Sequence, residues 1–111
     1  PLAFGSDAPV APLDPLLGLY AAVTRQDAAG QPPGGWQPDE RLTLAEAIHG
    51  YTLGPARLAG KADRQGSIAA GKWADLIMLD RNLFELEPAE IKEAKVELTV
   101  FDGQVVYRRA E

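Results

Sequence analysis

Cysteine is absent from the 111 residues of this chain. Its absence excludes disulfide bonds, cysteine-based zinc sites and thiol nucleophiles, and it agrees with the cytoplasmic location that we expect. The sequence also lacks an apolar run of membrane-spanning length and an N-terminal basic segment followed by an apolar one. We therefore expect no membrane partner for this chain.

Concentrated positive charge is lacking as well. The chain has 11 Lys and Arg residues against 16 Asp and Glu residues, a formal net charge of −5, and its one adjacent basic pair is Arg108-Arg109. Because nucleic-acid binding needs a basic surface, we expect no nucleic-acid partner. The hydrophobic fraction of 46% is enough to build a packed core, and the length suits one small domain.

The chain begins at Pro1 rather than at methionine, directly inside an apolar, strand-like segment. We expect it to be a piece of a longer protein, or a processed or trimmed one. Gly5 and Asp7 follow Phe4, and Pro9 ends any strand pairing. This order predicts a buried strand over residues 1–6 with a carboxylate at its C-terminal end, where parallel α/β barrels carry catalytic residues. Aspartate is also an ordinary turn residue, so turn capping is the alternative role.

Helical signals dominate the first part of the chain. Asp14-Pro15 marks the beginning of a helix over residues 15–24, with Asp at the N-cap and Pro at the first helical position. Thr43 and Glu46 form a capping-box pattern that begins a second helix ending near residues 52–54. A short third helix is expected over residues 55–59. The residues expected to be buried on the second helix are Leu44, Ala47, Ile48 and Tyr51.

A long loop is predicted over residues 25–41, because glycine and proline recur throughout it. We expect Trp36 to anchor this loop by packing, with lining of a substrate pocket as the other interpretation. Arg25 and Asp27 come just before the loop. They are candidates for substrate contact, although solvated loop charges are the commoner case.

Strand signals dominate from residue 65 onward. Asp102-Gly103 between two apolar runs is typical of a hairpin, because these residues tolerate the two positive φ values of a type I′ turn. We expect the strand over residues 74–79 to be buried on both faces, and Asp75 at its start to bond the amides of residues 71–73. The expected elements are strands at 66–68, 74–79, 96–101 and 104–108, with one or two helical turns at 88–93.

Several motifs follow one another along the chain: Gly5-Ser6-Asp7-Ala8-Pro9-Val10, Tyr20-Ala21-Ala22-Val23-Thr24-Arg25, Thr43-Leu44-Ala45-Glu46-Ala47-Ile48, Tyr51-Thr52, Gly66-Ser67-Ile68, Gly71-Lys72-Trp73-Ala74-Asp75-Leu76 and Thr99-Val100-Phe101-Asp102-Gly103-Gln104-Val105-Val106-Tyr107. Their order and spacing resemble the C-terminal end of a metal-dependent amidohydrolase, of the family that includes N-substituted formamide deformylases. The resemblance extends over essentially the whole chain.

The resemblance implies an α+β fold made of two parts. Residues 1–64 would be the last strand and helices of a (β/α)8 TIM-like barrel, and residues 65–111 the C-terminal part of a small β-sandwich. It also implies that Asp7 binds a divalent metal, expected to be zinc, and takes a proton from the attacking water. The implied substrate is a small molecule with an amide or cyclic amide C–N bond.

One departure from the family pattern concerns the metal ligands. The family uses a His-x-His pair and further ligands on other strands, whereas this chain has one histidine, His49, on a predicted helix. A single carboxylate cannot fill a zinc coordination shell, so we expect the isolated chain to bind no metal and to be inactive. We expect His49 to be a surface or packing residue. Ser6 has no paired histidine and is not expected to be a nucleophile.

A second interpretation of the chain is a small stand-alone α+β interaction module. Taken alone, the segment 1–6 and the faces of the helices at 15–24 and 43–52 would be left uncovered. Such apolar faces favour self-association, so we expect a homo-oligomer.

Overall fold

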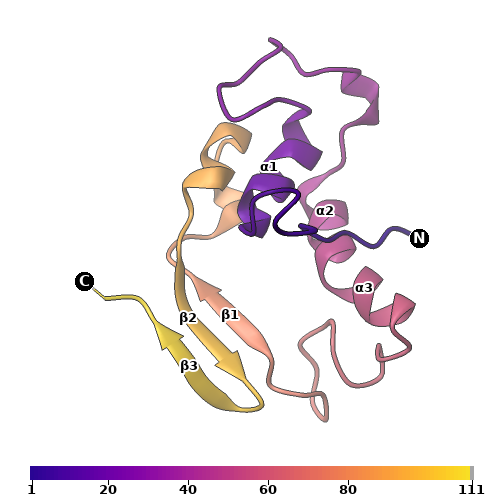
Figure 1. The fold of residues 1–111 in the computed structure, drawn as a ribbon, viewed down its shortest axis with the longest axis vertical. Helices are drawn as coiled ribbons and strands as arrows, with labels where there is room; N and C mark the ends of the chain where they lie inside the picture. Colours follow the sequence, from indigo (N-terminus) through magenta and orange to yellow (C-terminus); the bar gives the residue numbers. More distant parts are fainter. Residues whose placement is uncertain (111) are drawn as a thin grey trace.

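The α-helices lie in the first half of the chain and the strands lie in the second half, in the computed structural model that describes residues 1–110 (Figure 1). This mixed content agrees with the expected α+β class. None of the helices within residues 1–110 is both long and apolar enough to cross a membrane. With η marking a 3-10 helix, the elements are α1 (Pro15–Thr24), η1 (Pro38–Glu40), α2 (Leu44–Tyr51), α3 (Leu53–Leu58), β1 (Leu76–Leu79), η2 (Leu83–Glu85), η3 (Pro88–Glu93), β2 (Val96–Phe101) and β3 (Gln104–Arg108).

Helix α1 has the bounds that its sequence predicts. The Asp14 side chain accepts a hydrogen bond from the Leu16 amide at 2.9 Å, which satisfies one of the free donors of the first turn. Pro15 occupies the first helical position, where its missing N–H is not needed. The helix ends at Thr24, because the following residue, Arg25, has a φ of 58° that takes the backbone out of the helical region.

The capping box of α2 is confirmed. The Glu46 amide donates to the Thr43 hydroxyl at 3.2 Å, and the Thr43 amide donates to the Glu46 carboxylate at 2.8 Å. Helix α3 begins at Leu53, two residues before the predicted start at residue 55. Pro55 is tolerated there because the first-turn amides of a helix have no intrahelical partner.

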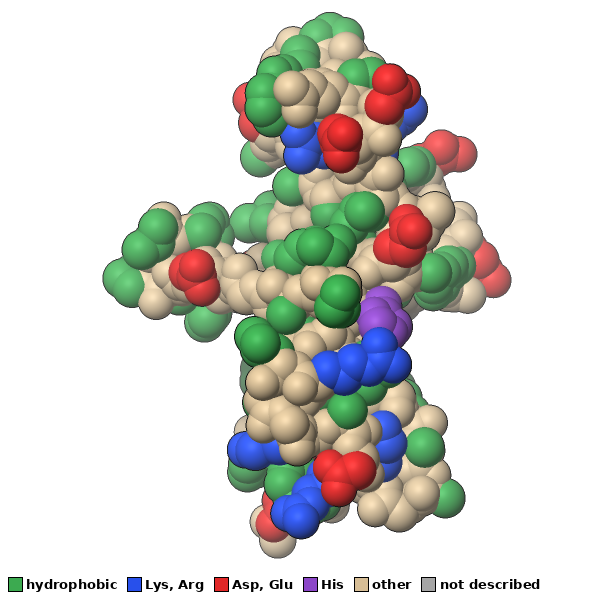
Figure 2. All heavy atoms as spheres, turned by 90° about the vertical axis from the view of Figure 1, so that its right-hand side faces the viewer, with side chains coloured by type: hydrophobic (Ala, Val, Ile, Leu, Met, Phe, Trp, Pro, Cys, Tyr) green, Lys and Arg blue, Asp and Glu red, His purple; other side chains and the backbone are tan. Residues whose placement is uncertain are grey.

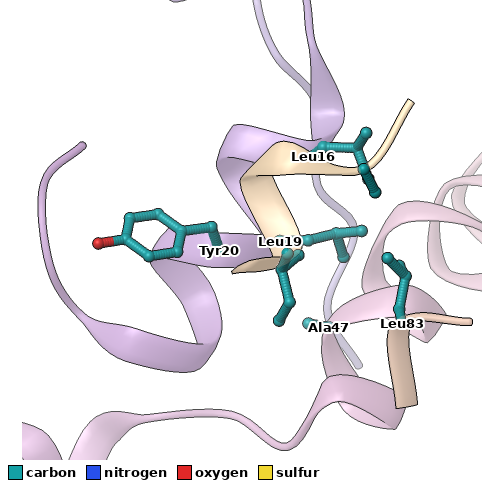
Figure 3. Packing of buried hydrophobic residues seen from close by; sticks show 7 residues of the cluster. Leu16, Leu19, Tyr20, Ala47 and Leu83 are labelled. Carbon is teal, nitrogen blue, oxygen red and sulfur yellow. The ribbon is translucent and has the colours of Figure 1, made fainter. Parts of the chain in front are cut away.

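The buried core lies between α1, α2, η2 and η3, and it joins residues from the first and second parts of the chain (Figure 3). Helix α1 is the central element, because it packs against both α2 and η3. The Lys92 ammonium lies 4.5 Å from the centre of the Tyr20 ring, which adds a cation–π contact between η3 and α1. The buried apolar residues of this core are Leu16, Leu19, Tyr20, Ala47, Leu83, Ile91 and Ala94.

The strands described by the structure form one antiparallel sheet in the order β1-β2-β3. The predicted hairpin between β2 and β3 is confirmed, with φ of 50° at Asp102 and 76° at Gly103. The Asp75 carboxylate accepts a hydrogen bond from the Asp102 amide at 2.8 Å. The prediction that Asp75 bonds the amides of residues 71–73 was therefore wrong, and its partner is the hairpin turn instead.

Three strand predictions need correction. Residues 1–6 have no regular secondary structure, and the Phe4 amide donates to the Gly50 carbonyl oxygen of α2. Gly66 and Ser67 are bends and Ile68 has no regular structure, and Gly66 has a φ of 94° that extended pairing does not use. Strand β1 covers only Leu76–Leu79. The side chains of Leu76, Ile77 and Met78 are exposed, and Leu79 is partly buried against the core.

Two further expectations were only partly right. The segment at 88–93 is helical as expected, but as the 3-10 helix η3. Trp36 does not pack into the molecule, since 61% of its surface is exposed. The long loop is instead held by its own hydrogen bonds and by Lys92, whose ammonium donates to the Ala28 carbonyl at 2.6 Å.

Candidate functional site

Asp7 lies at the surface, in a turn that follows the irregular segment 1–6. Its φ is 50°, in the left-handed region, and its carbonyl accepts a hydrogen bond from the Val10 amide at 2.8 Å. Aspartate tolerates this region better than most residues, because its short polar side chain can bond locally. The turn therefore presents an exposed carboxylate, which can accept a proton or bind a cation.

The segment before Asp7 is attached to α2. The Phe4 amide donates to the Gly50 carbonyl at 2.8 Å, and the Phe4 and Tyr51 rings meet edge to face with centroids 5.3 Å apart. The position of the Asp7 turn thus depends on contacts between residues more than 40 positions apart in the sequence. Periodicity along the chain carries no signal for these contacts.

The spatial grouping of metal-binding side chains, near Asp7 and elsewhere, decides whether the described residues can hold a metal ion. Within residues 1–110, no three or more His, Asp or Glu side chains gather closely enough to hold a metal ion. A zinc ion takes three or four protein ligands, and Asp7 can supply only one. The described residues therefore do not by themselves complete the metal centre that the sequence resemblance implies, and Asp7 would be one of its ligands.

His49 is an exposed residue in the last turn of α2, as expected (Figure 2, purple). It borders an open hollow of about 340 Å³ together with Leu2 and Glu46. The Glu46 carboxylate is already used by the capping box. Hydrogen bonds from the Thr43 amide and then from the Thr43 hydroxyl hold the pKa of Glu46 below its ordinary value. The hollow therefore does not assemble a His–carboxylate site.

Two charged residues singled out from the sequence, Arg25 and Asp27, have structural partners. The Arg25 side chain donates from Nε to the Trp36 carbonyl at 2.9 Å, and its guanidinium carbon lies 4.9 Å from the centre of the indole ring. The Asp27 carboxylate accepts from the amides of Ala29 and Gln31 at 2.9 and 3.0 Å. These charges organise the long loop. Ser6 is half-buried in the segment before Asp7.

Sequence reasoning did not predict a large open groove between α3 and the sheet. Its volume is about 860 Å³, and its walls come from α3, the segment 65–77 and the end of β2. The Lys72 ammonium donates to the Ser67 hydroxyl at 2.8 Å on one wall. The exposed apolar face of β1 continues the groove. The sequence predicts that the strand containing this apolar run, residues 76–79, is buried on both faces, whereas most of its side chains are exposed.

Comparison with known proteins identifies the family. A family model described as "Amidohydrolase family" matches residues 1–107. The chain therefore belongs to the amidohydrolase family, as its motifs predict. It is 39% identical over 106 residues to the protein YtcJ of Bacillus subtilis (strain 168), covering 96% of this chain and 20% of that protein. It is 37% identical over 108 residues to an N-substituted formamide deformylase of Arthrobacter pascens, covering 97% of this chain and 19% of the deformylase.

The fold has a counterpart among solved structures. A crystal structure of an amidohydrolase from Thermotoga maritima MSB8 superimposes with a TM-score of 0.63 at 28% sequence identity, over 93% of this chain and 22% of that one. The chain thus spans about a fifth of the length of the relatives that it matches.

Proposed function

We propose that this chain is the C-terminal part of a metal-dependent amidohydrolase that cleaves amide or cyclic amide C–N bonds of small molecules with water. Asp7 is one metal ligand and the general base, and the remaining ligands, expected for zinc, come from outside this chain. The observation that carries the proposal is the family match over residues 1–107, combined with an exposed carboxylate at Asp7. The isolated chain is inactive, because its described residues lack the other ligands.

The exposed turn at Asp7 leaves its carboxylate accessible for a role in the reaction. As general base, the Asp7 carboxylate accepts a proton from the attacking water and passes it to the leaving nitrogen. In the whole enzyme, residues 1–64 complete the barrel and residues 65–111 belong to the β-sandwich. The absence of cysteine favours a cytoplasmic enzyme.

The test uses Asp7→Asn in a chain of the length of its relatives. Asparagine also tolerates positive φ, so the turn is kept while the charge is lost. We expect kcat for amide hydrolysis to fall by about 10²–10⁴-fold and the bound zinc to decrease. Asp102→Asn is the matched control, because Asp102 has the same φ of 50° in an exposed turn at the hairpin. Equal activity of the two variants would contradict the proposal.

Calorimetry with zinc tests the inactivity of the isolated chain. We expect no more heat of binding than for its Asp7→Asn variant. Tight, stoichiometric binding that the variant loses would contradict an incomplete site. It would mean that ligands assemble between copies of the chain.

The alternative function, a self-associating interaction module, is favoured by the exposed apolar residues of the sheet. Ile77 is 50% and Val106 60% exposed. Burying such side chains against a second copy would stabilise a homo-oligomer. Under this alternative, Val106→Lys shifts the chain to the monomer in size-exclusion chromatography. A wild-type chain that elutes as a monomer at all concentrations would contradict it.

A further inference from the structure

We infer that Gly50 and Gly54 are positioning residues that hold the Asp7 segment in place; this inference rests on the function proposed above for Asp7. Gly50 lies in α2 and Gly54 in α3, and both are buried. Residues 1–6 lie against these two positions without forming a helix or a strand. Within the described residues, the contacts with these two glycines therefore hold the segment that carries the carboxylate.

Gly54 makes room for the backbone of the segment. A Cβ atom at this position would overlap the Leu2 carbonyl oxygen, and it would lie 3.3 Å from the Ala3 Cα. Backbone atoms cannot turn aside as a flexible side chain can. Any larger residue at position 54 must therefore displace the segment itself.

Gly50 makes room for the Phe4 ring. A Cβ atom there would lie 2.6 Å from Cε2 of that ring, well inside van der Waals contact. The ring cannot swing away without losing its edge-to-face contact with Tyr51. The Gly50 carbonyl also accepts the Phe4 amide at 2.8 Å, so this residue holds the segment through its backbone as well.

The link to Asp7 is short. Only Gly5 and Ser6 separate Phe4 from Asp7, and the turn beyond it closes on the Val10 amide. A shift of Phe4 therefore moves the carboxylate, and a displacement of about 1 Å is enough to lower catalysis by about 10²-fold. Gly50 and Gly54 act on the reaction through Asp7 and do not touch substrate.

The test compares Gly50→Ala and Gly54→Ala in the 111-residue chain. Helix propensity favours alanine over glycine, so positions without a packing role would gain stability. We expect the opposite sign, with lower stability and Phe4 amide hydrogen exchange at least about tenfold faster. The NMR signals of Asp7 should shift, whereas those of β2 and β3 should stay unchanged. Leu58→Ala is the control on α3, because Leu58 is 82% exposed.

A rescue experiment separates positioning from a general loss of stability. In the Phe4→Ala background the ring is gone, so Gly50→Ala should no longer destabilise the chain or shift the Asp7 signals further. If Gly54→Ala does not fold, the comparison of Gly50→Ala in the wild-type and Phe4→Ala backgrounds still tests whether Gly50 positions the segment. Unchanged Phe4 exchange and Asp7 signals in Gly50→Ala would overturn the inference. So would full destabilisation by Gly50→Ala in the Phe4→Ala background.

The two proposals fail in different ways. If Asp7 has no catalytic role, the full-length Asp7→Asn enzyme keeps its hydrolytic activity, while the Gly50→Ala and Gly54→Ala variants still show faster exchange of the Phe4 amide. If the glycines do not position Asp7, Asp7→Asn loses hydrolysis while the alanine variants leave the Asp7 signals unchanged.

Discussion

Ile91 in η3 and Ile77 in β1 are the same residue type, yet Ile91, between Glu90 and Lys92, is 2% exposed, whereas Ile77, in the apolar run 76–79, is 50% exposed. The helical region (α1, α2, η2 and η3) buries its apolar side chains against one another. The sheet region (β1, β2 and β3) leaves most of its apolar side chains exposed or half-buried, although Leu79 of β1 packs against the helical core. Burial is thus decided by the presence of a partner element and not by the hydrophobicity of the segment. The following predictions test this difference.

The largest expected effect comes from the isoleucine pair. Ile91→Ala removes a fully buried side chain and should lower the free energy of unfolding by about 2–5 kcal/mol, because it leaves a cavity. Ile77→Ala should cost less than about 1 kcal/mol, because half of that side chain is already in water. Urea denaturation of both variants measures the difference. Equal costs would show that the sheet region is covered in solution, for instance by a second copy.

The capping box tests the helical region alone. Thr43→Ala removes the acceptor of the Glu46 amide and should lower the free energy of unfolding by about 1 kcal/mol. Thr43→Ser keeps the hydroxyl and is the control. Amide exchange should accelerate in α2 and not in β2. A uniform acceleration would mean that the two regions unfold together.

The Asp75 contact tests the sheet region. Asp75→Ala leaves the Asp102 amide without its partner and should cost about 0.5–1.5 kcal/mol, measured as faster exchange of the hairpin amides. Asp75→Asn keeps an acceptor oxygen and should be close to wild type. If both variants behave as wild type, the hairpin turn is stable without this contact.

The smallest effect is the response to acid, which involves one carboxylate in each region. The Lys95 amide, followed by Arg81 and Arg109, holds the pKa of Asp80 below its ordinary value; Glu46 is lowered by the capping box. A carboxylate with a lowered folded-state pKa stabilises the fold at pH values above its ordinary pKa. That contribution is lost as the pH falls through the lowered value.

Thermal unfolding between about pH 6 and pH 2 should therefore show a falling midpoint below the ordinary carboxylate range. Asp80→Asn should remove the part of this pH dependence that Asp80 contributes. Thr43→Ala should remove the part that Glu46 contributes, because Thr43 lowers the pKa of Glu46. Added salt should weaken the contribution of Asp80 more, because its ion pairs with Arg81 and Arg109 are accessible to water. A midpoint that stays constant over this range would contradict the prediction.

Local signals in the sequence predicted local structure well. The cap of α1 at Asp14, the capping box of α2 and the hairpin at Asp102-Gly103 were all confirmed, because each depends on residues at most three positions apart. The family was predicted for the same reason, since several such motifs recur in fixed order. Asp7 was identified as a carboxylate after an apolar segment, and the structure places it in an exposed turn.

Contacts between distant residues could not be predicted. Asp75 bonds an amide 27 residues away, and Lys92 bonds a carbonyl 64 residues away. The apolar segment 1–6 carries the pattern of a strand, but it lies against α2 and α3 instead of a neighbouring strand. No pattern along the chain distinguishes a segment that pairs with a strand from one that packs on two glycines.

The sequence by itself determined the family, the helix beginnings, the hairpin turn and the carboxylate at Asp7, because side chains near one another in sequence select these features. Only the tertiary structure decided which apolar faces are buried, which partner Asp75 bonds and what holds the Asp7 segment. These depend on which elements meet in space. Contact energy is gained only where another surface is present, and a segment of sequence does not specify that surface.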